Sequence, residues 1–205
     1  MRGLRSTIRT FVKAQGGSRG ASRASKSGRV VTQRIGQVFS SIIGRGAEAT
    51  IKSIGLAEFL GADAETLLAR LVDYIAPDAA LLEENVARSA ALDVLAELFE
   101  RFGVEEKGIT VLNSLTSETL KTVLLEYVNK YIYTRILETL SKSSESYSAA
   151  TLVRVEKDIK DYVSETVKYD FGQVDMLTLD WLGKEGKEMV GRIYDEGYSL
   201  LEKIL

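Results

Sequence analysis

The chain has 205 residues, of which 45% are hydrophobic and 27% charged, so it is long enough to bury a hydrophobic core. It contains no histidine and no cysteine, which excludes the usual zinc sites, thiol nucleophiles, disulfides and Ser-His-Asp triads. The net charge of −2 hides an asymmetry, because ten of the 27 basic residues precede Glu48, the first of the 29 acidic residues. Such a basic segment favours an acidic surface, which could belong to nucleic acid, anionic lipid, another protein or the rest of the chain.

Two helices are predicted in the basic segment, which we define as residues 1–46. The first is short and amphipathic, ends at Gly16-Gly17, and has apolar residues at helical spacing, namely Leu4, Ile8, Phe11 and Val12. Residues 16–28 (GGSRGASRASKSG) are rich in Gly, Ser and Arg, which is typical of a linker. The second helix is predicted from about Arg29 to Ile43.

The acidic remainder, residues 47–205, is predicted to be a second domain made of helices. The predicted helices are Ala47–Leu60, a helix capped by Asp63 and stopped by Pro77, a helix from Asp78 to Phe102, a helix capped by Thr116 or Ser117 that ends near Lys142, Ala149–Tyr169 and Leu177–Leu205. Each apolar run lies within a longer 3.6-residue pattern, so no strand is expected. We therefore predict an all-α fold, an irregular multi-helix bundle with a basic N-terminal helical and linker extension.

Three sets of side chains within these helices carry further predictions. Close helix packing, or alternatively a partner-binding groove, is predicted at the glycines of the last helix, Gly183, Gly186, Gly191 and Gly197. Burial with a hydrogen-bonded hydroxyl, and not catalysis, is predicted for Tyr127, Tyr131, Tyr162 and Tyr194. A solvated surface is predicted for the adjacent acids Glu83-Glu84, Glu105-Glu106 and Asp195-Glu196.

The candidate site is a partner-binding surface in the basic segment. Its predicted residues are Arg5, Ile8, Arg9, Phe11, Arg19, Arg23, Arg29 and Arg34. On one helix, Arg19, Arg23, Lys26 and Arg29 would share a face and could follow phosphates, which leaves nucleic-acid binding as the alternative. No aromatic residue lies between Arg19 and Arg34, so stacking on single strands is not supported.

Several functional classes are disfavoured by what the sequence lacks. No nucleophile–base constellation, metal-ligand cluster or nucleotide-binding motif is present, so we expect a protein that is not an enzyme and holds no cofactor or metal. No stretch reaches the roughly 18 apolar residues of a membrane span, and the first helix is short enough to give only weak membrane attachment. We therefore expect a cytoplasmic protein.

Three segments carry a family resemblance: Leu68–Leu98 (LARLVDYIAPDAALLEENVARSAALDVLAEL), Ile109–Leu140 (ITVLNSLTSETLKTVLLEYVNKYIYTRILETL) and Gly191–Leu205 (GRIYDEGYSLLEKIL). In order and spacing they resemble QatB proteins of Qatuor (Qat), a four-component bacterial anti-phage defence system. The Arg/Gly/Ser-rich region before Glu48 also resembles the segment that precedes this domain in the family.

The resemblance implies a non-catalytic accessory protein. Its companions resemble an ATPase, a QueC-like nucleobase-modifying enzyme (QatC-type) and a TatD-like nuclease, and the QueC-like enzyme is the implied direct partner. The resemblance also makes this protein a candidate substrate of that enzyme, modified at an N-terminal tail. Family members carry a longer Gly/Pro/Ser-rich tail ahead of the basic helix, whereas this chain begins at Met1-Arg2-Gly3. The resemblance carries over no catalytic residue.

Overall fold

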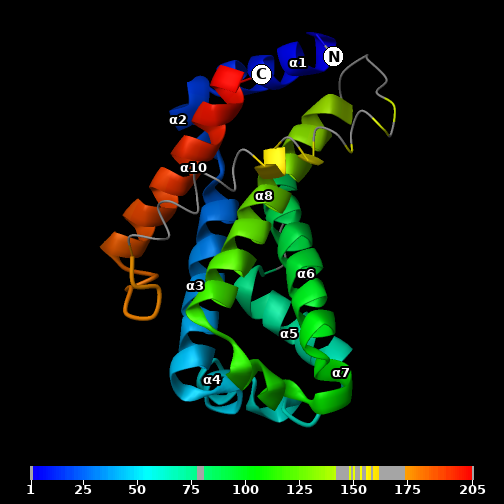
Figure 1. Ribbon diagram of the computed structural model, residues 1–205, viewed down its shortest axis with the longest axis vertical. Helices are drawn as coiled ribbons and strands as arrows, with labels where there is room; N and C mark the ends of the chain where they lie inside the picture. The colour runs from blue at the N-terminus through cyan, green and yellow to red at the C-terminus, as the bar shows by residue number, and fades with distance from the viewer. Residues whose placement is uncertain are drawn as a thin grey trace.

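The computed structural model describes residues 2–77, 81–141 and 174–204, together with residues 148, 150, 153, 156, 157 and 159–161. Within these ranges the chain forms helices and no strand, which confirms the all-α prediction. The α-helices are α1 (Arg2–Ala14), α2 (Gly17–Ala24), α3 (Lys26–Arg45), α4 (Ala47–Ser53), α5 (Ala64–Ile75), α6 (Leu82–Phe102), α7 (Val104–Lys107), α8 (Ser117–Ser141) and α10 (Lys184–Ile204), and the 3-10 helices are η1 (Ala57–Phe59) and η2 (Ile109–Ser114). Figure 1 shows α3, α6 and α8 running along the length of the molecule, with α4 and α7 at one end and α1 and α2 at the other.

The boundaries of three helices confirm residues that the sequence predicts to end or cap them. Before α5, the Asp63 carboxylate accepts a hydrogen bond from the backbone N–H of Thr66 at 2.7 Å, and this bond lowers the pKa of Asp63. Thr116 caps α8 in the same way, because its hydroxyl accepts from the backbone N–H of Thr119 at 3.2 Å. Gly103 ends α6 with a φ of 67°, a left-handed conformation that glycine adopts without steric cost.

Other predicted boundaries differ from the structure or fall beyond it. The range Ala47–Leu60 divides into α4 and η1, because Gly55 takes a φ of 83° and interrupts the helix. The predicted cap at Asp78 and most of the predicted helix Ala149–Tyr169 lie outside the described residues.

The last helix begins at Lys184 and not at Leu177, so the predicted start is wrong by about two turns. A folded turn precedes it instead, in which the Asp180 carboxylate accepts from the backbone N–H of Gly183 at 3.0 Å. Within the same turn, the buried indole of Trp181 donates its N–H to a backbone carbonyl at 3.1 Å. These local bonds replace the hydrogen bonds that a continued helix would have made.

The segment predicted as a linker, residues 16–28, is mostly helical, so that prediction is wrong. Gly16 and Gly17 take φ values of 86° and 79° and turn the chain from α1 into α2. Gly20 and Ala21 are then buried, and α2 lies along α10 (Figure 1). Small residues allow the backbones of two helices to approach closely. The glycine and serine residues of this segment therefore serve helix packing and do not make the chain flexible.

Helix α3 lies at the centre of the bundle and contacts α4, α6, α8 and α10. Two of its glycines let aromatic rings approach its backbone. A Cβ added at Gly28 would lie 2.5 Å from the ring of Tyr131, and a Cβ added at Gly36 would overlap the indole of Trp181. The buried apolar side chains of this helix are Val31, Ile35, Val38, Phe39 and Ile42.

The predicted division between residues 1–46 and 47–205 separates a basic from an acidic part of the sequence. In the structure, helices from the two parts pack against each other. Helices α1 and α2 lie on α10, and α3 lies against α6 and α8. At the boundary itself, the backbone N–H of Ala47 donates to the side-chain oxygen of Asn113 at 2.7 Å. Whether the two parts act as separate functional units stays a prediction.

Candidate functional site

The predicted partner-binding residues of α1 are divided between the core and the surface. Ile8 is fully buried and Phe11 is 7% exposed, where α1 packs against α2, α8 and α10. Arg9 is exposed to solvent. The side chain of Arg5 lies outside the part of the structure that is described. The apolar members of the predicted set therefore hold α1 on the bundle, while Arg9 remains accessible.

Arg19 and Arg23 are both exposed and lie one turn apart on α2. The continuous basic face predicted for one helix is not formed. Ser25 interrupts the helical path with φ −91° and ψ 45°, so that Lys26 and Arg29 belong to α3. The structure thus brings Arg19 and Arg23 together and separates them from the other two.

Arg29 and Arg34 are partly buried on α3, where they contact other helices. Arg34 donates to the backbone carbonyl oxygen of Tyr74 at 3.2 Å, at the C-terminal end of α5, where positive charge is favoured. The guanidinium of Arg29 lies beside Gly191 of α10, and the missing side chain leaves room for it. Of the glycines predicted to allow close helix packing, Gly191 faces a side chain of α3, Gly183 lies before α10, and Gly186 approaches the backbone of Trp181 in the preceding turn, so packing against another helix stays a prediction there.

The acidic part of the chain meets the basic segment at helix N-termini. Glu202 of α10 accepts from the backbone N–H of Ser18 at 3.3 Å, and Glu83 of α6 accepts from that of Ser27 at 3.0 Å. Neither α2 nor α3 has an acidic residue in its own first turn, so these distant carboxylates supply the favourable negative charge. Within the described residues, no basic side chain from positions 8 to 45 forms an ion pair.

Glu83 also belongs to a polar network in the middle of the bundle, although the sequence predicts a solvated carboxylate there. That prediction is wrong, because Glu83 is partly buried and accepts a hydrogen bond from the hydroxyl of Tyr131. Arg135 donates to the hydroxyl oxygen of Ser25 at 2.9 Å, and Ser25 shares a hydrogen bond with the hydroxyl of Tyr198 at 3.0 Å. The network joins α6, α8 and α10 to the junction of α2 and α3.

Two buried tyrosines, Tyr131 and Tyr198, belong to this network, and Tyr127 and Tyr194 are buried beside Tyr131. Burial raises the pKa of each phenol above its ordinary value. Their hydroxyls are hydrogen-bonded, for example Tyr194 to Thr32 at 3.1 Å. The predicted burial is confirmed for Tyr127, Tyr131 and Tyr194, while Tyr162 lies outside the described residues. The hydroxyls of Tyr127 and Tyr131 donate, to the carbonyl oxygen of Ala87 and to the carboxylate of Glu83 respectively.

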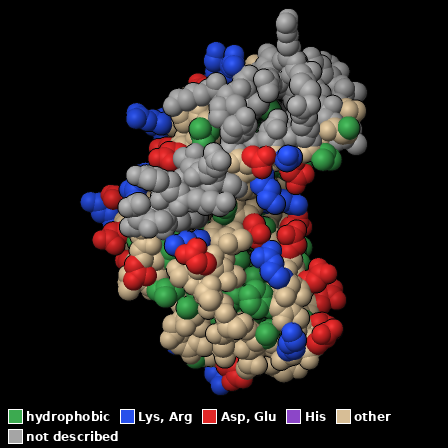
Figure 2. All heavy atoms as spheres, viewed as in Figure 1, with side chains coloured by type: hydrophobic (Ala, Val, Ile, Leu, Met, Phe, Trp, Pro, Cys, Tyr) green, Lys and Arg blue, Asp and Glu red, His purple; other side chains and the backbone are tan. Residues whose placement is uncertain are grey.

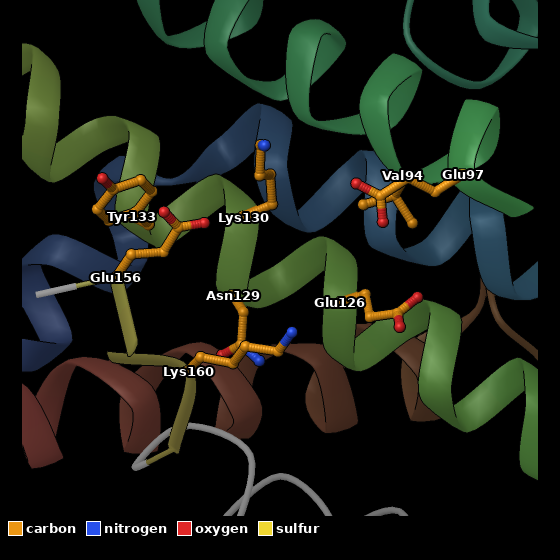
Figure 3. Close-up of a pocket in the computed structure, with 8 residues that line it drawn as sticks. All are labelled: Val94, Glu97, Glu126, Asn129, Lys130, Tyr133, Glu156 and Lys160. Carbon is orange, nitrogen blue, oxygen red and sulfur yellow. The ribbon is translucent and has the colours of Figure 1, made fainter. Parts of the chain in front are cut away.

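A charged hollow of about 100 Å³ lies between α6 and α8 and has no counterpart among the sequence predictions. Figure 3 shows its side chains: Val94 and Glu97 on α6, Glu126, Asn129, Lys130 and Tyr133 on α8, and Glu156 and Lys160 from beyond α8. Lys130 is paired with Asp93 at 3.0 Å, and this contact raises the pKa of Lys130. Charges of both signs surround the hollow, which has room for a few water molecules but not for a typical small-molecule ligand.

Within the described residues, no group of three or more acidic side chains is placed to hold a metal ion. The described helices include none that is both long enough and apolar enough to cross a membrane.

Comparison with known protein families identifies the family of this chain. The model of a family described as Qat anti-phage system associated protein QatB matches residues 16–201 of the 205. The chain belongs to the QatB family. The match begins after α1 and extends from α2 into the last turns of α10, so the basic helices α2 and α3 lie inside the region that the QatB family shares. No curated protein and no solved structure matches the chain.

Three residues that organise this QatB-family fold were missed by sequence reasoning. Ser25 is hidden in a low-complexity stretch, and Glu83 stands beside a second glutamate, which is typical of solvated surface. Arg135 follows Tyr131 by four residues on α8, so the two side chains share a helix face. That spacing could have predicted the contact, because a guanidinium on the same helix face as a buried tyrosine can donate a hydrogen bond to its hydroxyl oxygen.

Proposed function

We propose that this chain is a non-catalytic component of the Qat system that acts in the bacterial cytoplasm and binds the QueC-like enzyme of the same system. The observation that supports binding is a set of basic side chains on α1 and α2 that are exposed and have no ion pair within the described residues. We call this set the basic surface, and it consists of Arg9, Lys13, Arg19 and Arg23. Arginine side chains of this kind suit carboxylate or phosphate groups on a partner.

We further propose that the QueC-like enzyme modifies this protein at its N-terminal region. Helix α1 begins at Arg2, at the same end of the molecule as the basic surface (Figure 1). An enzyme bound to the basic surface would therefore hold the start of α1 close to itself. This proximity converts modification into a reaction within one complex, which favours it over modification of unbound proteins.

Co-expression with the QueC-like protein tests both proposals. Co-elution in size-exclusion chromatography supports binding, and separate elution at low salt contradicts it. An increase in the intact mass of this chain supports the substrate role. Co-elution with an unchanged mass supports binding and contradicts modification. The ATPase and the TatD-like nuclease of the system are further candidate partners, and the same co-expression with each of them tests those contacts.

Charge reversal on α2 makes this test specific. Arg19→Glu and Arg23→Glu change exposed side chains that the fold does not use, so the variants should remain folded but elute apart from the enzyme. Lys107→Glu, on α7 at the other end of the molecule, is the matched control and should still co-elute. If all three variants co-elute with the enzyme to the same extent, the interface does not include the basic surface.

Nucleic-acid binding is the second candidate function, favoured by the same unpaired arginines. It predicts a mobility shift of DNA or RNA by the protein alone, with an affinity that falls steeply as salt rises. Arg19→Glu should then weaken that shift, since each phosphate contact contributes about one released counterion. A DNA shift without co-elution of the enzyme would favour this function over the proposed one.

A further inference from the structure

An apolar groove with an acidic rim lies at the end of the molecule opposite the basic surface. Helices α5, α6 and α7 form it, and its volume is about 320 Å³. Its floor consists of Ala64 and Leu68 of α5 together with Ala96 and Phe99 of α6. In Figure 1, α7 lies at the lower end of the molecule, whereas α1 and α2 lie at the upper end.

The spacing of residues along two helices creates this floor. Ala64 and Leu68 are four residues apart on α5, and Ala96 and Phe99 are three residues apart on α6, so each pair lies on one helix face. The two alanines leave space beside the larger side chains. Gly103 then turns the chain with a φ of 67°, and the short helix α7 begins directly at the edge of the groove.

The rim of the groove is acidic and comes from all three helices. Its carboxylates are Glu65, Glu100, Glu105 and Glu106, which are all exposed. None of them forms an ion pair with another described residue. Figure 2 shows acidic side chains gathered along the lower right edge of the face in view, over α6 and α7. Unpaired like charges around an apolar floor repel one another, so a cationic ligand would be stabilised there.

We propose that this groove binds a basic amphipathic segment of a partner protein. One or two apolar side chains of that segment contact Leu68 and Phe99, while its Lys or Arg side chains pair with the rim carboxylates. The volume is near the lower limit of about 300–1,000 Å³ for ligand pockets, which suits a few side chains of a helix. This interface is additional to the basic surface, and its position allows the protein to hold two partners at the same time.

A second copy of this chain is a poorer occupant than a different protein. The most basic helix of another copy, α1, offers positive charge, but its apolar side chains are buried in its own core at Ile8, Phe11 and Val12. Contact between the basic end of one copy and the acidic end of the next would also be head-to-tail and would extend into filaments unless the rotation closed a ring.

Fluorescence anisotropy of the full chain with a labelled peptide tests this inference. The probe is a fifteen-residue helical peptide of alanine and lysine with two leucines four residues apart. We expect saturable binding, and we expect the double variant Glu100→Lys/Glu105→Lys to weaken it about tenfold or more through like-charge repulsion. The matched control is Glu185→Lys, a reversal of an exposed charge on α10, which should bind within about twofold of the original chain.

One further peptide, together with the oligomeric state of the protein alone, distinguishes binding in the groove from general electrostatic attraction. A peptide with both leucines changed to serine should bind about tenfold more weakly, because the apolar contacts are lost. Equal binding of the two peptides, or equal binding by the double variant and the original chain, would overturn the inference. A dimer or filament of the protein alone, abolished by Glu100→Lys/Glu105→Lys, would also overturn it and assign the groove to a second copy.

Discussion

Glu83 stabilises two helices that are far from it in the sequence. Its carboxylate accepts from the backbone N–H of Ser27 at the start of α3 and from the hydroxyl of Tyr131 in α8. Negative charge at a helix N-terminus is favourable, and hydrogen bonds to charged groups are stronger than those between neutral groups. A residue that sequence reasoning assigns to solvent therefore contributes to the central polar network.

Replacing Glu83 by glutamine removes its charge and preserves its shape. We expect Glu83→Gln to lower the free energy of unfolding by about 1–2 kcal/mol, because a charged acceptor is lost at the N-terminus of α3. Urea unfolding at neutral pH measures this change. Glu100→Gln, at an exposed position without an ion pair, is the control and should change stability by less than about 0.5 kcal/mol. Equal losses would show that the contacts of Glu83 contribute nothing.

The buried tyrosines predict a loss of stability at alkaline pH. In the unfolded chain a phenol ionises near pH 10, while burial raises the folded-state pKa of Tyr127, Tyr131, Tyr194 and Tyr198 above that value. The contribution of these tyrosines to the free energy of unfolding is therefore fully present below about pH 10. It is lost as the pH rises from there towards their folded-state pKa values. Each tyrosine should contribute a slope of about 1.4 kcal/mol per pH unit above pH 10.

Urea unfolding between pH 8 and pH 11 tests this dependence. The variant Tyr198→Phe has no ionisable hydroxyl at that position. Its free energy of unfolding should therefore fall less steeply with pH, by the slope of about 1.4 kcal/mol per pH unit that one tyrosine contributes. The variant also loses the hydrogen bond to Ser25, which lowers stability by a similar amount at every pH and does not change the slope. Identical slopes for the two proteins would show that Tyr198 does not stay neutral in the fold.

Among the helices, α2 shows how one composition can serve two purposes. Glycine and serine make a chain flexible when it is solvated, but they also let two helices approach closely. In α2 the second effect dominates, because Gly20 and Ala21 are buried and α10 lies alongside. The same principle applies in α3, where glycines face aromatic rings.

Two glycines of α3 should respond in opposite ways to alanine. Gly36→Ala places a methyl group within the indole of Trp181 and should lower the free energy of unfolding by about 1–3 kcal/mol. Gly44 is exposed in the same helix, and a Cβ there meets nothing within 4 Å, so Gly44→Ala should raise stability by up to about 1 kcal/mol. Thermal or urea unfolding of the two variants measures both effects. A gain at both positions would contradict the close contact between α3 and the indole.

For the whole molecule, the fold turns an asymmetry along the sequence into a difference between two ends. The basic surface lies on α1 and α2, and the acidic-rimmed groove lies beside α7 (Figure 1). Charge separated in this way steers partners of opposite sign to opposite ends. A protein from a multi-component system can use such polarity to bring two other proteins together.

This polarity predicts how partner binding depends on salt. If the QueC-like enzyme binds as proposed, its association should slow as ionic strength rises from about 0.05 M to 0.5 M, because salt shortens the distance over which surface charges attract one another. Surface plasmon resonance measures the rate. Arg19→Glu with Arg23→Glu should lower the association rate about tenfold at low salt and remove most of the salt dependence. A rate that is independent of salt in the original chain would contradict electrostatic steering by the basic surface.

By itself the sequence determined the helical fold, several helix ends, the burial of Tyr127, Tyr131 and Tyr194, and the family. Hydrophobic periodicity, helix capping and turn formation depend on residues that are close in the sequence. The family resemblance depends on the order of segments along the chain, which the sequence also gives. Only the tertiary structure decided that residues 16–28 are mostly helical, that the partly buried Glu83 joins a polar network and which arginines remain exposed. These outcomes depend on partners distant in the chain, such as Ser27 and Glu83, 56 residues apart, or Ser25 and Tyr198, 173 apart. Local composition cannot specify what a helix meets, because burial and pairing of charge are properties of the assembled fold.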